Sequence, residues 1–254
     1  MSNSILITGA GSGIGQGVAE YLGRAGHRIV VTDLDEAAAR RTADLIRVDG
    51  GHAKALRLDV HNQSEIDGLG DALADDPVEV LINSAGLQYV SALEEFPPER
   101  FDLMIRVMLN GAAMLSRALL PGMRAAGYGR IINIGSIHSL VASPYKSAYV
   151  AAKHGLLGFS KVLALETADC DVTVNTICPS YVKTPLVEQQ IVDQARANGI
   201  SESEVVSEIM LKPMPKGVFI GIDELGALAV FLMSSAARNI TGQAIAVDGG
   251  WTAR

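Results

Sequence analysis

The sequence is poor in cysteine and has no excess of basic residues. Its 254 residues include only two cysteines, Cys170 and Cys178. Two are too few for a disulfide framework, and their spacing fits no zinc pattern. We therefore expect two reduced thiols, as in a cytoplasmic protein, and no bound metal. The formal net charge of −7 leaves no surplus of positive charge to neutralise phosphates. We therefore expect neither a nucleic acid nor a membrane as partner.

Long apolar runs, repeats, low-complexity tracts and linkers are also missing. No stretch reaches the ~18 consecutive apolar residues of a transmembrane helix. The first residues enter a short apolar run without the basic region and long apolar segment of a secretory signal. Apolar residues nevertheless make up 48% of the chain, which is enough to bury a sizeable core. The simplest prediction is one soluble domain that spans residues 1–254.

Seven short apolar segments alternate with longer segments of mixed polarity. The short segments are rich in Ile, Val and Leu and show little period-2 alternation, which is typical of strands covered on both faces. They are residues 4–8, 28–32, 53–58, 78–83, 130–135, 171–177 and 243–247. The clearest helical segments are residues 13–25, 36–49, 63–74, 98–127 and 146–168. This alternation predicts an α/β fold with a doubly wound parallel sheet of about seven strands and helices on both faces.

One long segment, residues 179–221, shows no clear pattern. It follows the end of a predicted strand, and several residues in it interrupt regular structure: Pro185, Gly199, Pro213, Pro215 and Gly217. A segment of this length in a compact domain is often an active-site lid. We therefore predict a substrate lid at about residues 180–221, with a peripheral helical excursion as the alternative.

A glycine-rich string follows the first predicted strand and opens the first predicted helix. It reads Thr8-Gly9-Ala10-Gly11-Ser12-Gly13-Ile14-Gly15. Glycines permit a tight turn and a close approach of backbone to a pyrophosphate, and free N–H groups at the helix start attract its charge. Because the required strand and helix flank the string, it predicts a Rossmann-type dinucleotide site. The cofactor-binding residues expected here are Gly9, Ser12, Gly13, Ile14 and Gly15.

Asp33 closes the second predicted strand, eighteen positions after Gly15. A carboxylate at this place can accept hydrogen bonds from the adenosine ribose hydroxyls, and it would repel a 2′-phosphate. The loop contains Ser12 and no basic residue that could receive that phosphate. The sequence therefore favours NAD over NADP as cofactor. Taken alone, Asp33 would be an ordinary turn residue.

Two further short segments fall at the ends of predicted strands. Asp59-Val60 follows the third strand, and Asn83-Ser84-Ala85-Gly86 follows the fourth. Ligands of open α/β folds bind at this carboxyl edge of the sheet. We predict cofactor contacts from Asp59, Val60, Asn83, Ala85 and Gly86, although each segment alone would more often be a turn.

Tyr149 and Lys153 are four residues apart in a predicted helix, which places them on one face. A tyrosine normally ionises near pH ~10. A nearby ammonium favours the phenolate and should lower the pKa of the tyrosine, which could then exchange a proton with an alcohol near neutral pH. Ser136, just after the fifth predicted strand, could hydrogen-bond the substrate oxygen. Asn110 could join a proton path through water. A surface helical pair is the alternative for Tyr149 and Lys153 alone.

The ordered set of motifs resembles the short-chain dehydrogenase/reductase family over essentially the whole chain. The resemblance rests on residues 8–15, on the turn at residues 83–86 and on the trio Ser136, Tyr149 and Lys153. It implies that Tyr149 is the general acid and base, that Lys153 lowers its pKa and binds the nicotinamide ribose, and that Ser136 orients the substrate. Asn110 would hold a relay water. One departure is Ser84, which stands where the family usually has a second Asn.

The same resemblance implies further contacts and an assembly. Cofactor contacts are implied at Tyr149, Lys153, Pro179, Val182 and Thr184. A homotetramer is implied, with the helical segments 98–127 and 146–168 in one interface and the C-terminal strand region in another.

Several strings resemble the branch of this family that oxidises short 3-hydroxy acids such as 3-hydroxybutyrate. They are Gly86-Leu87-Gln88, Ser136-Ile137-His138, residues 146–155, residues 184–188 and residues 248–254. A short hydroxy acid needs donors for its carboxylate. The resemblance assigns that role to Gln88, His138 and Lys146, which follow strands near the carboxyl edge. The other substrate contacts that it implies are Ser136, Tyr149, Tyr181 and Gln190.

Some positions depart from that branch and keep other substrates open. Tyr181 and Ser180 stand where the branch usually carries Trp and Gly, and Pro144-Tyr145 precedes Lys146 where smaller residues are usual. Trp251 is expected to pack near the C-terminus, with a pocket wall in an oligomer as the alternative.

The leading prediction is therefore an NAD-dependent oxidoreductase that transfers a hydride between a short 3-hydroxy acid and NAD. The same chemistry on a polyol, a cyclic ketone or a 3-oxoacyl thioester is one alternative. A catalytically silent nucleotide-binding protein is the other.

Overall fold

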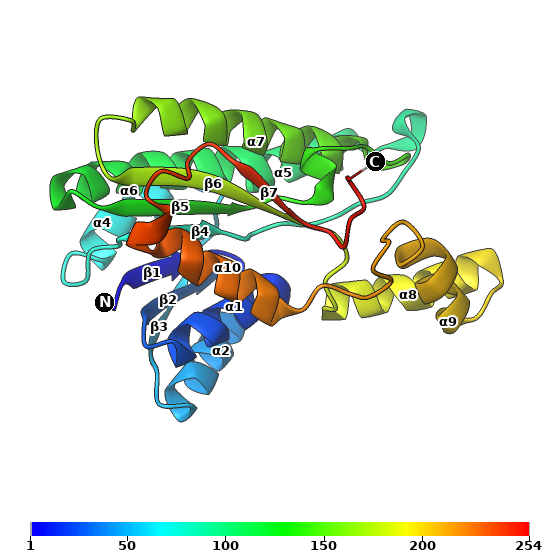
Figure 1. The fold of residues 1–254 in the computed structure, drawn as a ribbon, viewed down its shortest axis with the longest axis horizontal. Coiled ribbons are helices and arrows are strands. Elements are labelled where there is room, and N and C mark those ends of the chain that lie inside the picture. Colours follow the sequence, from blue (N-terminus) through cyan, green and yellow to red (C-terminus); the bar gives the residue numbers. More distant parts are fainter. Residues whose placement is uncertain (1, 254) are drawn as a thin grey trace.

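The structure, a computed structural model, describes residues 2–253 apart from the side chains at positions 186 and 197. Its centre is one sheet of seven parallel strands in the order β3-β2-β1-β4-β5-β6-β7 (Figure 1). The strands are β1 (Ser4–Ile7), β2 (Arg28–Asp33), β3 (His52–Arg57), β4 (Val80–Asn83), β5 (Gly129–Ile134), β6 (Val172–Pro179) and β7 (Ala244–Val247). The predicted doubly wound parallel sheet is confirmed.

The central strands are apolar along their whole length because both of their faces are covered. In β1, Ile5 and Ile7 point into one hydrophobic cluster, and Leu6 points into the cluster on the opposite face. All four residues of β1 are buried. A strand in this position needs an apolar side chain at every residue, which explains the missing period-2 pattern.

Three helices cover the first face: α1 (Gly13–Arg24), α2 (Glu36–Val48) and α10 (Ile222–Met233) (Figure 1). Asp35 starts α2 by accepting hydrogen bonds from the backbone N–H groups of Ala37 and Ala38 at 2.9 and 3.2 Å. Helices α1 and α10 lie very close, since a Cβ placed at Gly226 would stand 2.5 Å from Cγ of Tyr21. Glycine at position 226 is therefore required by packing.

The opposite face carries α3 (Gln63–Asp67), α4 (Leu69–Ala72), α5 (Pro98–Ile105), α6 (Ala112–Ala126) and α7 (Ser147–Glu166). The predicted helix over residues 98–127 is divided, because Arg106–Gly111 forms a π-helical turn between α5 and α6. The run Pro98–Ala126 has the length and apolar composition of a membrane span, contrary to the sequence expectation. Core helices pass the same test, and Leu115 and Met123 of this run are fully buried against the sheet. The run is therefore weak evidence for a membrane span.

The segment predicted to be a lid contains more regular structure than its sequence pattern indicates. It forms α8 (Pro185–Asn198), α9 (Glu202–Glu204) and a π-helical turn at Val205–Met210, which lie to one side of the main body (Figure 1). Val187, Val205 and Met210 form a small apolar cluster of their own. Thr184 caps α8 by accepting a hydrogen bond from the N–H of Val187 at 3.4 Å, and Pro185 occupies the first helical position.

The strand order reverses between β1 and β4, which lie side by side although β2 and β3 separate them in sequence. Loops that follow neighbouring strands diverge at such a point and leave a crevice at the carboxyl edge of the sheet. The glycine-rich string follows β1, and the turn at residues 83–86 follows β4. The fold therefore brings the two predicted cofactor motifs to one edge.

Candidate active site

The glycine-rich loop folds back tightly against the turn that follows β4. Gly9 and Gly13 have φ angles of +61° and +59°. A Cβ placed at Gly9 would lie 2.7 Å from Cα of Ala85, and one placed at Gly15 would lie 2.3 Å from the carbonyl oxygen of Gly9. Ser12 makes no side-chain capping bond, so side chains leave the first N–H groups of α1 free. This backbone cradle and the positive end of α1 fit a pyrophosphate.

Asp33, at the end of β2, is bound to the same loop. Its Oδ2 accepts a hydrogen bond from the N–H of Gly11 at 2.9 Å, and its Oδ1 accepts one from the N–H of Asp35 at 3.0 Å. A Cβ placed at Gly11 would stand 2.8 Å from Asp33 Oδ2. The loop thus holds a carboxylate beside the cradle, where the ribose of a dinucleotide would reach it.

The other predicted cofactor residues fall into two groups. Asp59 and Gly86 lie at the carboxyl edge, and Asp59 Oδ1 lies 2.7 Å from Nδ1 of His61. Val60 and Asn83 are 7% and 5% exposed, so their side chains are largely buried.

The start of the lid lies beside the glycine loop. Pro179 ends β6, and Val182 pairs with Ile220 in an isolated parallel bridge. A Cβ placed at Gly13 would stand 4.0 Å from Cγ2 of Thr184, which is ordinary van der Waals contact. The structure therefore brings Thr184 to the cradle, as the resemblance implied.

The cradle, the carboxylate of Asp33 and the free N–H groups of α1 together fit a dinucleotide. Among residues 2–253 the structure contains no group of three His, Cys, Asp or Glu side chains arranged to hold a metal ion.

Tyr149 and Lys153 lie on α7, one helical turn apart. Lys153 is 5% exposed, and its Nζ donates a hydrogen bond of 2.7 Å to the carbonyl oxygen of Ile134 at the end of β5. The distance from Lys153 Nζ to the ring centroid of Tyr149 is 5.7 Å. Burial lowers the pKa of Lys153 to about 8, because the charged form loses its hydration.

The net shift in the pKa of Tyr149 is opposite in direction to the expected one. Burial raises the pKa of Tyr149, and the hydrogen bond with Ser136 acts in the opposite sense without reversing the shift. Desolvation of the phenolate outweighs a cation whose Nζ is already turned towards Ile134. At neutral pH the phenol therefore keeps its proton and is ready to donate it to a carbonyl oxygen.

Ser136 is held in place by the short 3-10 helix Ile137–Ser139 that follows β5. Its Oγ accepts a hydrogen bond from the N–H of His138 at 3.1 Å, and its own N–H donates to Oγ of Ser139 at 3.3 Å. Ser136 is 8% exposed, and its hydroxyl is close enough to that of Tyr149 to lower the pKa of the phenol. Two hydroxyls therefore meet where a substrate oxygen would be placed.

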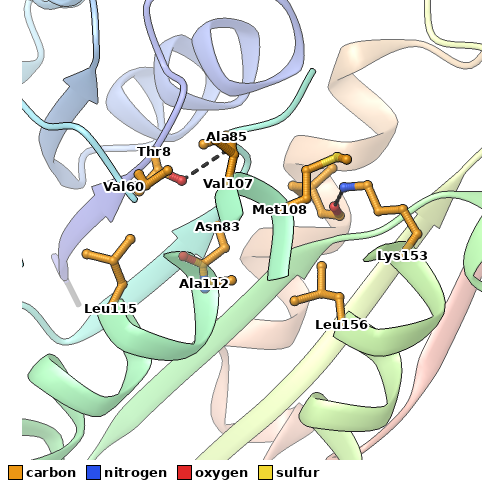
Figure 2. A pocket seen from close by; sticks show the side chains of 11 residues that line it. Thr8, Val60, Asn83, Ala85, Val107, Met108, Ala112, Leu115, Lys153 and Leu156 are labelled. Atoms are coloured by element: carbon orange, nitrogen blue, oxygen red, sulfur yellow. Dashed lines mark hydrogen bonds between the residues drawn. The ribbon is translucent and has the colours of Figure 1, made fainter. Parts of the chain in front are cut away.

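The relay role assigned to Asn110 is not supported by its position. Asn110 is exposed and lines a cavity with His61, Gln63 and Arg106 on the outer side of the helical run. Lys153 lines a different cavity, to which this run contributes Met108 (Figure 2). Met108 and Asn110 thus line two separate cavities, and only that of Met108 also contains Lys153.

A cluster of cationic and aromatic side chains adjoins Tyr149. Nε2 of His138 lies 3.4 Å from Nζ of Lys146 and 3.4 Å from Oγ of Ser143. The rings of His138 and Tyr149 meet edge to face, with centroids 6.1 Å apart. Burial and the neighbouring Lys146 lower the pKa of His138 to about 4, so His138 is neutral at pH 7. Burial also lowers the pKa of Lys146.

The segment predicted to be a lid and the C-terminus both lie beside these side chains. Gln190 of α8 donates a hydrogen bond of 3.3 Å to Oε1 of Gln88 on the body. Trp251 packs against Tyr181, with ring centroids 5.9 Å apart, and against His138, with centroids 6.3 Å apart. Trp251 thus packs beside His138 and Tyr181 within its own chain. Sequence reasoning missed these ring contacts and the contact of Ser143, and the only signal was the C-terminal string that contains Trp251.

The fold and this site define a Rossmann-type oxidoreductase that uses a nicotinamide nucleotide and acts on a small molecule. A family model described as enoyl-(acyl carrier protein) reductase matches residues 9–252. The chain is similar to D-beta-hydroxybutyrate dehydrogenases of Rhizobium meliloti and Cupriavidus necator. It is 44% identical to the first over 100% of both chains. It is 45% identical to the second over 98% of this chain and 97% of that one.

A structural comparison agrees. The structure of an actinorhodin polyketide ketoreductase variant with NADPH superimposes with a TM-score of 0.93 at 33% identity, and it covers 98% of this chain and 97% of that one. The chain belongs to the short-chain dehydrogenase/reductase family.

Proposed function

We propose that this enzyme is an NAD-dependent dehydrogenase of short 3-hydroxy acids, with 3-hydroxybutyrate and acetoacetate as the substrate pair. The observation that carries the proposal is the Lys146–His138 pair beside Tyr149. A cation in a half-buried pocket next to the proton donor suits a carboxylate a few atoms away from the reacting carbon. The two hydroxybutyrate dehydrogenase relatives support the same substrate class.

The chain's own residues supply binding and proton transfer. Ser136 and Tyr149 hydrogen-bond the hydroxyl of the substrate, and Tyr149 Oη takes its proton during oxidation or returns it during reduction. The nicotinamide ring, when bound, accepts or donates the hydride at the carbinol carbon. Lys153 faces Tyr149 across one helical turn and is placed to bind the ribose hydroxyls. Lys146, His138, Gln88 and Gln190 hold the carboxylate.

The preference for NAD rests on Asp33. Its carboxylate is held beside the cradle by the N–H groups of Gly11 and Asp35 and cannot turn away without losing both bonds. A 2′-phosphate at this place would meet a fixed negative charge. We expect kcat/KM with NAD to exceed that with NADP by roughly 10²-fold or more, since close like charges cost several kcal/mol.

Substitution of Asp33 tests this preference. In Asp33→Ser the ratio of kcat/KM for NAD to that for NADP should fall at least ~10-fold, chiefly through better use of NADP. Asp35→Ser is the matched control, because Asp35 caps α2 two residues away and its Oδ1 bonds only backbone of that helix. A ratio that is unchanged in Asp33→Ser, or changed equally in both variants, contradicts the assignment.

The substrate is tested by NAD reduction on a panel of hydroxy acids of graded length, each paired with its neutral alcohol or methyl ester. The proposal expects the highest kcat/KM with 3-hydroxybutyrate and a loss of at least ~10-fold for each neutral partner, because a charge-assisted hydrogen bond contributes about 1.5–3 kcal/mol. Turnover of polyols, cyclic alcohols or 3-hydroxyacyl thioesters without turnover of short hydroxy acids would reject it in favour of the same chemistry on another substrate.

We further propose a cytoplasmic homotetramer. Val162 and Leu165 on the outer side of α7 are 56% and 79% exposed, and such side chains favour a helix-to-helix interface of this region. Both cysteines are free thiols, as expected in a reducing compartment. Light scattering of the purified enzyme measures the assembly, and a mass near that of one chain would contradict it.

A further inference from the structure

The hydrogen-bond directions beneath the crevice fix the orientation of one buried amide. Ser160 donates its only hydroxyl hydrogen to the carbonyl oxygen of Leu156 at 2.7 Å, and its Oγ accepts from Thr176 at 2.9 Å. The group of Asn133 that lies 2.8 Å from this Oγ must therefore be the donor Nδ2. Oδ1 of Asn133 then accepts a hydrogen bond of 2.8 Å from Asn83, so the donor atom of Asn83 must be its Nδ2. The acceptor Oδ1 of Asn83 is left facing the other way.

This oxygen is buried, and it faces a small cavity. Asn83 is 5% exposed, and no donor among residues 2–253 lies within hydrogen-bonding distance of its Oδ1. The cavity has a volume of about 10 Å³, which is the lower limit for one water molecule. Figure 2 shows Asn83 in the middle of the cavity, between Thr8 and Lys153. A buried acceptor without a donor is costly, so the cavity favours a polar occupant.

The same cavity contains a hydroxyl that has a hydrogen to donate. Oγ1 of Thr8 accepts hydrogen bonds from the N–H groups of Ser84 and Ala85 at 3.0 and 3.1 Å, which engages both of its lone pairs. Thr8 is 1% exposed, so its hydroxyl hydrogen also needs an internal acceptor. A donor directly after β1 and an acceptor at the end of β4 thus line one cavity and are not bonded to each other.

We propose that this cavity is a binding site for one water molecule, which accepts a hydrogen bond from the Thr8 hydroxyl and donates one to Oδ1 of Asn83. The water joins the ends of β1 and β4 at the point where the strand order reverses. Gly9, next to Thr8, contacts Ala85 of the turn. The water therefore adds a bridge to the two direct hydrogen bonds between Thr8 and the turn at residues 83–86, and Thr8 and Asn83 are positioning residues for the dinucleotide.

A crystal structure of the wild-type protein at about 1.5 Å resolution is the direct test. One ordered water should lie within about 3.2 Å of both Thr8 Oγ1 and Asn83 Oδ1. The absence of density in the cavity, in maps that show other buried waters, would overturn the proposal. This readout is independent of the substrate and of any activity.

Two variants of a cavity wall test the water in solution. Ala112, at the start of α6, is 5% exposed and lines the cavity. Ala112→Val and Ala112→Thr crowd the site equally, because both side chains are β-branched and similar in shape, but only Thr can replace the hydrogen bonds of the water. The Tm of the Thr variant should exceed that of the Val variant by about 2–6 °C. A Val variant as stable as the Thr variant, or more stable, indicates a dry cavity and overturns the proposal.

The positioning role has its own readout, the dissociation constant of NADH measured by fluorescence. Relative to Ala112→Thr, Ala112→Val should bind NADH roughly threefold or more weakly, because the loop and the turn lose the bridge from Thr8 to Asn83 and keep only the two direct bonds to Thr8. The KM for NAD should rise accordingly with kcat largely retained. A Tm difference without any difference in NADH affinity would overturn the positioning role, since a merely structural water leaves the folded site unchanged.

Discussion

Replacing Tyr149 by Phe will reduce kcat in both directions by roughly 10²–10⁴-fold, the usual contribution of a positioned general acid or base. The ring still packs against His138, and only the hydroxyl that exchanges the proton is lost. NADH binding, followed by fluorescence, should stay within about twofold of wild type, because the cradle formed by α1 and Asp33 is not altered. This pair of results separates an enzyme from a catalytically silent nucleotide-binding protein.

The pH dependence gives the same experiment a second readout. Burial raises the pKa of Tyr149, so the phenol is protonated at neutral pH. Oxidation of the alcohol needs the phenolate and should accelerate as pH rises towards that pKa, whereas reduction of the ketone needs the phenol and should slow. The residual activity of Tyr149→Phe should lack this dependence. Tyr21→Phe, on the far face of the molecule against α10, is the control and should keep both rate and profile. Near-normal turnover in Tyr149→Phe would contradict the mechanism.

The fold was predictable because strands that are buried on both faces of the sheet appear in the sequence as short, continuous apolar segments. Strands such as β1 need apolar side chains on two faces. Gly9 and Gly15 are required by close backbone contacts that leave no room for a Cβ atom. Helix α8 was covered only by the alternative of a peripheral helical excursion, and its bounds were not predicted, for a related reason. It packs mainly against a small cluster of the lid, so most of its surface is polar and its apolar periodicity is weak.

The side of the helical run on which Asn110 lies could not be predicted from helical periodicity. Residues 106–111 form a π-helical turn, in which the chain advances by more residues per turn than in an α-helix. The side-chain directions on either side of such a turn are out of phase, and a continuous 3.6-residue pattern over residues 98–127 places them wrongly. Only the folded chain shows that Met108 faces Lys153 and that Asn110 faces outwards.

The predicted direction of the pKa shift of Tyr149 was wrong for an energetic reason. The four-residue spacing correctly predicts that Lys153 lies near the phenol, but spacing carries no information on desolvation. In the folded chain the amine is itself buried and bound to Ile134, so its influence on Tyr149 is smaller than the cost of burying the phenolate. The packing of Trp251 depends in the same way on tertiary contacts, which join the C-terminus to His138.

Lys146→Ala will raise the KM for 3-hydroxybutyrate by roughly 10–100-fold, which corresponds to the loss of one charge-assisted hydrogen bond to the carboxylate. Lys146 lies 3.4 Å from a neutral His138, so no second cation of that pair can replace it at pH 7. The KM for NAD should change by less than about twofold, because Lys146 lies at the substrate end of the site and the cradle is formed by other residues. Steady-state kinetics with each substrate varied in turn measures both constants.

The control for this variant is Lys54→Ala, which removes the same charge from an exposed position on the edge strand β3, away from α7. It should leave both KM values unchanged, since a solvent-exposed charge outside the pocket is screened within about 8–10 Å at physiological salt. If the two variants raise the KM for the acid equally, the effect is one of net charge. If Lys146→Ala leaves that KM unchanged while Tyr149→Phe abolishes turnover, the chemistry stands, but the carboxylate binds elsewhere and the substrate assignment fails. The specificity for an acid therefore depends on where one buried ammonium lies relative to the proton donor.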